Sequence, residues 1–171
     1  GHDSEDVFLA AYLNGYFETG IKNILDKAIL EYKKTNLKGY KKIEEIPYDF
    51  NRKRSSVITE YDKVLKMTTK GAPEEIFKIC TNYYDGQNIK PLTKEVQLTT
   101  NKIYDELSSQ GFRILAIAEK IINEKKLRYD ASEETNLTLK GFMVFYDPPK
   151  TDVRETLVMM KEHGIDIKIL T

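Results

Sequence analysis

The stretch Lys66–Phe77, "KMTTKGAPEEIF", begins like a strand and ends like a helix. Pro73 suits the first helical position, because the N–H that proline lacks would have no partner there anyway. Glu74 and Glu75 suit the same turn, where the helix dipole favours negative charge. Lys70 lies just upstream, at the end of the dipole that repels a cation. The stretch therefore predicts a firm strand-to-helix junction and leaves the role of Lys70 to be explained.

The composition is that of an ordinary globular chain. Of 171 residues, 40% are apolar and 32% are charged, with 27 basic and 27 acidic side chains. This balance lacks the basic excess of a nucleic-acid-binding surface, so we expect no nucleic-acid partner. Cys80 is the only cysteine, which excludes internal disulfides and cysteine-based zinc sites, and we expect no metal site. No apolar run reaches the roughly 18 residues of a membrane span.

The order of the expected elements predicts an α+β fold, an antiparallel β-sheet flanked by helices. Apolar spacing and capping residues predict helices over residues 4–17, 19–32, 73–80 and 93–110. Runs of β-branched and aromatic residues predict strands over residues 41–50, 55–61, 63–69, 112–122 and 137–147, with tight turns at 61–63 and 85–86. The 112–122 segment is apolar on both faces, so we expect it in the middle of the sheet.

The second helix has an expected start at Thr19, which is a good N-cap residue. Five apolar residues would then share one face of this helix: Ile21, Ile24, Leu25, Ala28 and Ile29.

A proline pair divides the chain. After Pro148-Pro149, a helix over residues 151–163 and a strand over 165–170 would complete a short C-terminal βαβ unit with the preceding strand. Two strands and one helix make no core alone. We therefore expect one domain over residues 3–146 and the beginning of a second, truncated domain over residues 147–171.

Arg113 is the first residue that resists a purely structural interpretation. In a strand it shares one face with Leu115 and Ile117. A cation on an apolar face needs an anionic partner or a route to water. A carboxylate would satisfy it, and a phosphate suits the guanidinium fork equally well.

Phe50 is the second such residue. Ile46, Tyr48 and Phe50 alternate along one expected strand face, and the polar run "NRKR" follows. Phe50 is therefore either a core aromatic or a platform on which a base stacks while nearby cations meet phosphates. With Lys70 and Arg113, the second interpretation predicts a nucleotide pocket.

The helix start in the opening stretch gives this pocket a direction. Glu74 and Glu75 occupy the helix N-terminus at which a phosphate would otherwise dock. The triphosphate should lie elsewhere, so Lys70 should serve the base or sugar end. Motifs of common hydrolases and phosphate loops are absent: the chain contains no G-x-S-x-G, H-E-x-x-H, G-x-x-x-x-G-K-[ST] or G-x-G-x-x-G.

Five motifs in order, "DFNRKRSSV", "KGAPEEI", "GFRILAIA", "GFMVFYDPPK" and "GIDIKILT", give the chain a family resemblance. From about residue 5 onward it resembles the nucleotide-binding domain of the P-type ATPases, cation pumps that pass through an aspartyl-phosphate. The segment "AYLNGYFETGIKNILDKAI" is most similar to the bacterial magnesium-transporting branch.

The resemblance assigns residues to an adenine end. Phe50 would stack on adenine, and Lys70 with Gly71 would line the adenine pocket. Asp26 falls where many family members have a glutamate that contacts the adenine amino group.

At the other end of the nucleotide, the resemblance implies that Arg113 meets the phosphates. Lys53 matches the lysine that approaches the phosphates. Because this segment is shorter than in calcium pumps, Arg52 or Arg54 could take that role instead. The hinge to the phosphorylation domain would be formed by Asp147, Pro148 and Pro149.

The resemblance also implies the partners. The ligand would be ATP, as Mg-ATP in the complete pump, and the partners would be the phosphorylation and actuator domains of a bacterial plasma-membrane protein. The family's phosphorylated Asp would precede residue 1, so this cytoplasmic domain is expected to bind ATP without hydrolysing it and to hold no catalytic residue. Two alternatives are a regulatory or partner-docking module without nucleotide, and a fragment of a haloacid-dehalogenase-like phosphohydrolase.

Overall fold

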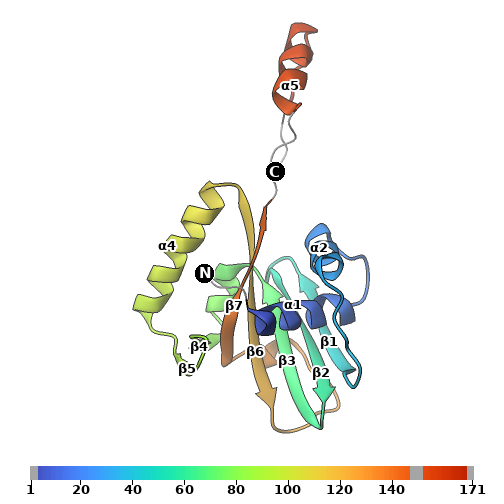
Figure 1. Cartoon of the computed structure of the whole chain (residues 1–171), viewed down its shortest axis with the longest axis vertical. Coiled ribbons are helices and arrows are strands. Elements are labelled where there is room, and N and C mark those ends of the chain that lie inside the picture. Colours follow the sequence, from blue (N-terminus) through green and yellow to red (C-terminus); the bar gives the residue numbers. More distant parts are fainter. Residues whose placement is uncertain (1–3, 147–151, 169–171) are drawn as a thin grey trace.

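A seven-stranded sheet forms the body of the protein (Figure 1). The computed structural model describes residues 4–146 and 152–168. The spatial order of the strands is β1-β2-β3-β6-β7-β4-β5. Their bounds are Lys41–Asp49 (β1), Arg54–Tyr61 (β2), Val64–Gly71 (β3), Cys80–Tyr84 (β4), Ile89–Pro91 (β5), Phe112–Ile122 (β6) and Leu137–Tyr146 (β7). The expected α+β class is confirmed.

The pairing of the strands is antiparallel except at one place. β4 pairs with β7 in parallel, which corrects the expectation of a purely antiparallel sheet. After β3, the chain passes through a short helix and crosses to the far side of β6 and β7, which are later in sequence. A parallel neighbour requires a crossover of this kind, whereas a hairpin gives an antiparallel one.

Five α-helices and one 3₁₀ turn belong to the described residues: α1 (Glu5–Phe17), α2 (Ile24–Tyr32), α3 (Pro73–Phe77), α4 (Lys94–Ser109), α5 (Val153–Glu162) and η1 (Ala131–Glu133). α1 lies across one face of the sheet, here called the α1 face (Figure 1). No described helix is both long and apolar enough to cross a membrane.

β6 is central, as its sequence predicts, and it separates two cores. Ile117 packs with α1 and α2 on the α1 face. Ala116 and Ala118 pack on the opposite face, with Ile76 and Phe77 of α3. Since successive side chains of a strand alternate in direction, Arg113 shares the α1 face with Ile117.

Both predicted tight turns are present. Asp62 and Lys63 join β2 to β3 with φ of 47° and 64°, the two left-handed residues of a type I′ hairpin. Asp85 accepts hydrogen bonds from the backbone N–H groups of Gln87 and Asn88 in the β4–β5 turn.

The start of the second helix differs from the expectation. α2 begins at Ile24 and is capped by Asn23, whose side chain accepts from two backbone N–H groups. Thr19 instead donates its backbone N–H to Glu45, and Gly20 breaks the helical path with φ of 93°. Ile21 is therefore fully exposed rather than part of an apolar face.

Two further boundaries differ. α3 ends at Phe77, so Cys80 begins β4 instead of ending a helix. The predicted C-terminal helix is present as α5, but residues 165–168 are not in a strand, so the βαβ unit stays a prediction. The expected hinge, Asp147, Pro148 and Pro149, lies outside the described residues, and the division into domains likewise stays a prediction.

Candidate functional site

Lys70 is buried at the end of β3, where it contacts two carboxylates on the α1 face. Its ammonium donates to Asp26 and lies 3.3 Å from Glu18 Oε2. The side chains of Lys70, Asp26 and Glu18 are 5%, 3% and 15% exposed. The structure thus brings together two of the predicted site residues, Lys70 and Asp26, and adds Glu18, which the sequence did not indicate.

The segment between α1 and α2 holds these carboxylates in place. Glu18 is the C-cap residue of α1, and Asp26 lies in the first turn of α2. Lys22, between them, donates to the backbone carbonyl of Glu18. Burial lowers the pKa of Lys22, and the charges of Glu18 and Asp26 partly offset that effect. Near the end of α1, the buried Asn14 amide donates to two backbone carbonyls, of β2 and β3, at 3.2 and 2.9 Å.

Phe50 lies just after β1, in the turn that connects it to β2. It is 86% exposed and makes an edge contact with Tyr48, with ring centroids 5.5 Å apart. The core-aromatic interpretation is therefore wrong. A β-bulge between Ile46 and Asp49 interrupts the expected alternation, so Ile46 is buried while Phe50 projects into solvent.

Asp49 organises this turn. Its Oδ1 accepts from the backbone N–H groups of Asn51 and Arg52, at 3.0 and 2.9 Å. Its carbonyl oxygen accepts from Lys53 N at 2.7 Å, and Lys53 takes a left-handed conformation with φ of 47°. An Asp side chain that binds the following backbone amides is a common way to fix a turn.

Gly71 allows the turn to approach the end of β3. Ala72 N donates to Lys53 O at 3.0 Å. A Cβ at Gly71 would lie only 2.5 Å from both Lys53 O and Arg54 Cβ. Glycine is required here by close backbone contact, which brings the Phe50-bearing turn beside the residue that follows Lys70. Lys53 Nζ lies 3.5 Å from Glu74 and is about half exposed.

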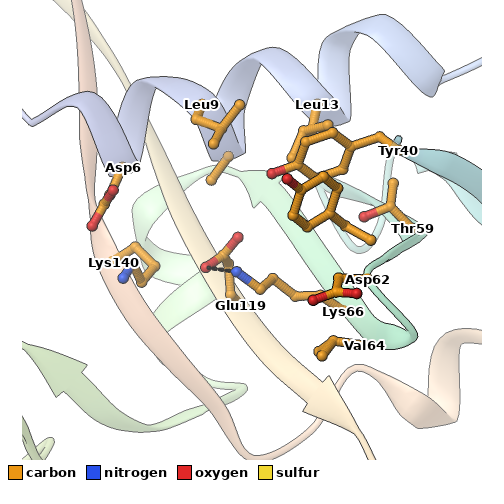
Figure 2. Close-up of a pocket in the computed structure, with 12 residues that line it drawn as sticks. Asp6, Leu9, Leu13, Tyr40, Thr59, Asp62, Val64, Lys66, Glu119 and Lys140 are labelled. Carbon is orange, nitrogen blue, oxygen red and sulfur yellow. Dashed lines mark hydrogen bonds and ion pairs between the residues drawn. The ribbon is translucent and has the colours of Figure 1, made fainter. Parts of the chain in front are cut away.

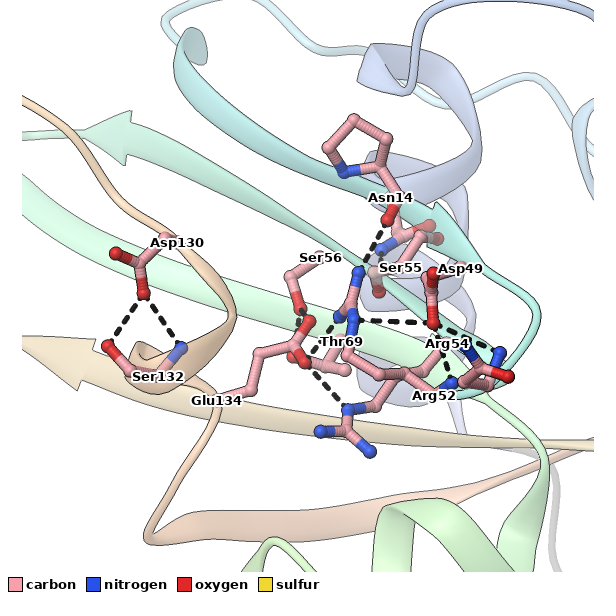
Figure 3. A network of polar contacts seen from close by, with 12 residues as sticks. Asn14, Asp49, Arg52, Arg54, Ser55, Ser56, Thr69, Asp130, Ser132 and Glu134 are labelled. Atoms are coloured by element: carbon pink, nitrogen blue, oxygen red, sulfur yellow. Dashed lines mark hydrogen bonds and ion pairs between the residues drawn. The ribbon is translucent and has the colours of Figure 1, made fainter.

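The side chains of Arg52 and Arg54 bind a partner on the sheet face opposite to Lys70. In the β2–β3 register Ser55 is opposite Lys70, and Ser56 is opposite Thr69 on the other face of the sheet. Arg52 Nη1 and Arg54 Nε both donate to Glu134 Oε2, at 2.6 and 2.7 Å, on the face of Ser56 (Figure 3). Of the three cations considered for the phosphates, Arg52 and Arg54 pair with Glu134, whereas Lys53 pairs with Glu74.

Arg113 is at the start of β6, on the α1 face and exposed. The strand partner of Lys70 is Ile117, four residues further along β6. At about 3.3 Å per residue, Arg113 lies roughly 13 Å along the strand direction from the level of Lys70. The two cations therefore occupy separate positions on one face.

No sequence motif pointed to Glu18 or Glu134. Glu18 follows the 13-residue helix α1 and Glu134 follows the 3₁₀ turn η1, and each precedes a threonine, in "FETG" and "SEETN". Their importance comes from contacts with residues 52 and about 80 positions away in the chain, Lys70 for one and Arg52 with Arg54 for the other. Local pattern carries no information about pairing at such separations.

A cavity of about 360 Å³ lies elsewhere on the α1 face, near the β2–β3 hairpin (Figure 2). Tyr40 and Tyr61 stack there with centroids 4.4 Å apart, and Lys66 lies 3.4 Å from Glu119. Its lining includes neither Lys70 nor Phe50. The candidate site therefore lies outside this cavity. Within residues 4–146 and 152–168, no group of three or more His, Cys, Asp or Glu side chains is placed to hold a metal.

Comparisons with known proteins agree with the fold. A family model described as "P-type ATPase, cytoplasmic domain N" matches residues 10–152. The chain is 38% identical to the "Magnesium-transporting ATPase, P-type 1" of Salmonella typhimurium strain LT2 over 177 aligned residues, and 36% identical to the protein of that name in Escherichia coli K12. Each alignment covers 100% of the chain and 20% of the relative, so the chain spans about a fifth of their length.

A relative of lower identity is named for a different ion. The "Calcium-transporting ATPase 1" of Bacillus cereus is 30% identical over 132 residues, which covers 77% of the chain and 15% of that protein.

Proposed function

The chain belongs to the P-type ATPase cytoplasmic domain N family, and we propose that it is the ATP-binding domain of an ion-transporting pump. It binds the adenine nucleotide and presents the γ-phosphate to the phosphorylated Asp of the complete pump. The observation that carries this proposal is the exposed Phe50 ring on a turn that Gly71 allows to pack beside Lys70.

The adenine end is formed by Phe50, Lys70, Gly71 and Asp26. The exposed ring offers a stacking surface, and stacking of a base on an aromatic side chain is worth about 1–3 kcal/mol. An ammonium has three N–H donors, and two carboxylates contact that of Lys70. The third N–H is directed by these contacts and suits a purine ring nitrogen. Asp26 provides an acceptor for the adenine amino group.

The phosphate end is formed by Lys53 and Arg113. The cluster around Lys70 is balanced, because Lys70 and Lys22 face Asp26 and Glu18. It therefore provides no excess positive charge for a triphosphate. Arg113 lies on the same face but away from this cluster, and Lys53 forms only a long, half-exposed pair with Glu74. A phosphate chain extended away from Lys70 meets these two cations.

In the complete pump, this domain works with phosphorylation and actuator domains of the same protein. ATP arrives as Mg-ATP, and closure about Asp147, Pro148 and Pro149 brings the γ-phosphate to the aspartate, which converts a chance encounter into a positioned one. The chain itself binds ATP without hydrolysing it. The magnesium-transporting relatives support a bacterial plasma-membrane pump for Mg²⁺, with this domain on the cytoplasmic side.

Phe50→Ala tests the proposal. Titration with ATP, followed by amide NMR shifts, should show perturbations clustered at Phe50, Lys70 and Arg113 in the wild type. The substitution should weaken ATP binding about tenfold, the loss of one stacked base. The melting temperature should hardly change, because the ring is 86% exposed.

Ile89→Ala is the matched control, an exposed apolar side chain on β5 at the opposite edge of the sheet. It should leave the ATP affinity unchanged. Scattered or absent shifts in the folded wild type would reject nucleotide binding and favour a regulatory or docking module. ATP hydrolysis by the isolated chain would contradict the proposal that it binds ATP without hydrolysing it.

A further inference from the structure

Glu134 is a fully buried carboxylate that the proposed nucleotide site does not use directly. It follows the 3₁₀ turn η1, in a loop between β6 and β7 that is otherwise largely exposed. Its side chain is 0% exposed. A buried charge of this kind persists only with close, hydrogen-bonded partners.

The contacts of Glu134 use both of its oxygens. Oε2 accepts from Arg52 Nη1 at 2.6 Å and from Arg54 Nε at 2.7 Å. Oε1 accepts from Ser56 Oγ at 2.7 Å, and Ser56 Oγ is also 2.7 Å from Thr69 Oγ1 (Figure 3). Hydrogen bonds between ionised partners are among the strongest in proteins.

Both arginines belong to the turn that carries Phe50 and Lys53. Arg52 additionally donates through Nη2 to Pro47 O at 2.8 Å, so its guanidinium spans the base of the turn. Lys53, between the two arginines, is held in a left-handed conformation that a side-chain-bearing residue adopts only when its surroundings impose it. Glu134 fixes the residues on both sides of this strained position.

Glu134 cannot act by touching a nucleotide at Lys70. The Ser56 side chain that it contacts, and the Thr69 hydroxyl bonded to Ser56, lie on the sheet face opposite to Lys70. Any effect of Glu134 on binding must therefore pass through the turn.

We propose that Glu134 is a positioning residue of the nucleotide site: it holds Arg52 and Arg54 so that the turn presents Phe50 to the base and Lys53 to the phosphates. This inference rests on the proposed function. It assigns a role to the loop after β6, which lies about 80 positions from the turn in sequence, and it makes Arg52 and Arg54 structural partners rather than phosphate ligands.

Glu134→Gln is the direct test, because it removes the charge and keeps the shape. In the absence of nucleotide, the amides of residues 50–53 should become mobile, seen as a fall in their {¹H}–¹⁵N NOE. The dissociation constant should rise about tenfold for adenosine, because stacking on a positioned ring is lost, and at least as much for ATP, which also loses the positioned Lys53. A role in folding alone would lower the melting temperature without singling out these amides.

Glu119→Gln is the matched control. Glu119 is also a partly buried carboxylate that accepts from a cation and a hydroxyl, Lys66 and Thr68, but it lies on the α1 face near the hairpin. This variant should leave the turn amides and both affinities within about twofold of the wild type. If Glu134→Gln also leaves them unchanged in a folded protein, the positioning role is overturned.

Arg52→Gln keeps the test decisive if Glu134→Gln does not fold, because Arg54 and Ser56 still satisfy Glu134. Weakening for adenosine as well as for ATP supports positioning. Weakening for ATP alone identifies Arg52 as a phosphate ligand and overturns the proposal. A wild type that binds neither ligand refutes the proposed function, whereas the NOE of the turn in the nucleotide-free variants still decides whether Glu134 holds it.

Discussion

Two buried ion clusters lie back to back on the same pair of strands. The Lys70 cluster, formed by Lys70, Asp26 and Glu18, is on the α1 face, and the Glu134 cluster, formed by Glu134, Arg52 and Arg54, is on the other. One has a cation between two carboxylates, and the other has a carboxylate between two guanidiniums.

The two clusters differ in what surrounds the central charge. The Lys70 cluster joins β3 to Glu18 at the end of α1 and Asp26 at the start of α2, through one ammonium whose donors have no fixed plane. The Glu134 cluster binds two planar guanidiniums of one turn and a strand hydroxyl. In the roles proposed above, the first arrangement leaves a donor for a ligand, whereas the second fixes backbone geometry.

Lys70→Met should give the largest effect, because it leaves the Asp26 carboxylate buried without its nearest cation. Loss of one partner of a buried ion pair costs about 3–5 kcal/mol of the free energy of unfolding. Urea denaturation measures this loss. The double variant Lys70→Met/Asp26→Ala should recover more than half of it, because the most deeply buried carboxylate is gone and Glu18 still has the charge of Lys22 nearby. A single-variant loss below about 1 kcal/mol would show that the cluster is effectively solvated.

Gly71→Ala should disturb both clusters at once. The new Cβ would lie 2.5 Å from Lys53 O and Arg54 Cβ, so the turn must move away from β3. We expect a loss of about 1–3 kcal/mol, as for overpacking, measured by urea denaturation.

Gly15→Ala is the contrasting glycine variant. Its Cβ would meet Asp26 Oδ1 at 3.6 Å, an ordinary contact, inside α1. This variant should gain up to about 1 kcal/mol from helix propensity. Equal losses of unfolding free energy in Gly71→Ala and Gly15→Ala would show that the fold tolerates neither added methyl group. The close approach at Gly71 would then not explain the loss.

Cys80 shows what burial does to an ionisable group in the apolar core on the Glu134 face. Burial raises the pKa of its thiol from 9.0 to about 12. Because the folded pKa is the higher one, the stabilising contribution is complete below pH 9 and is lost as the pH rises from there towards 12. The stability advantage of wild type over Cys80→Ala should therefore fall by about 1.4 kcal/mol per pH unit above pH 9. A pH-independent difference would contradict this burial.

Lys33→Gln should give the smallest effect. Lys33 Nζ lies 2.7 Å from Glu5, but the two side chains are 52% and 81% exposed. Such surface pairs contribute about 0–1 kcal/mol and are screened by salt. The melting temperature should shift by no more than about 2–4 °C. A loss comparable to that of Lys70→Met would remove the distinction between buried and exposed pairs.

The sequence predicted the fold class and the central place of β6, because period-two apolar patterns and turn residues act locally. The predicted boundaries of α2 and α3 were wrong, because contacts with the rest of the fold can override local helix preferences. Thr19 is a good helix cap by type, but it binds Glu45 of β1 instead. The parallel pairing of β4 was also missed, since strand order depends on contacts between distant segments.

The candidate site was predictable only in part. Lys70 and Gly71 stand out because a strand, a close turn and a helix meet there, and the structure places Asp26 against Lys70. The exposure of Phe50 depends on a β-bulge between Ile46 and Asp49. The apolar alternation of Ile46, Tyr48 and Phe50 in the sequence does not indicate this bulge. Which face Arg52 and Arg54 occupy could not be predicted, because it depends on Glu134, far away in sequence.

The strand order has a consequence for the time course of folding. β1, β2 and β3 are consecutive hairpins and can form early, whereas β4 and β5 end up at the far edge of the sheet. The two parts join only when β6 and β7 insert between them, and the β3–β6 register brings together residues as distant as Leu65 and Ile122. Closing loops of that length is slow. During synthesis, the edges of β3 and β4 therefore stay open until β6 and β7 have emerged, and this interval is when the chain is most exposed to mispairing.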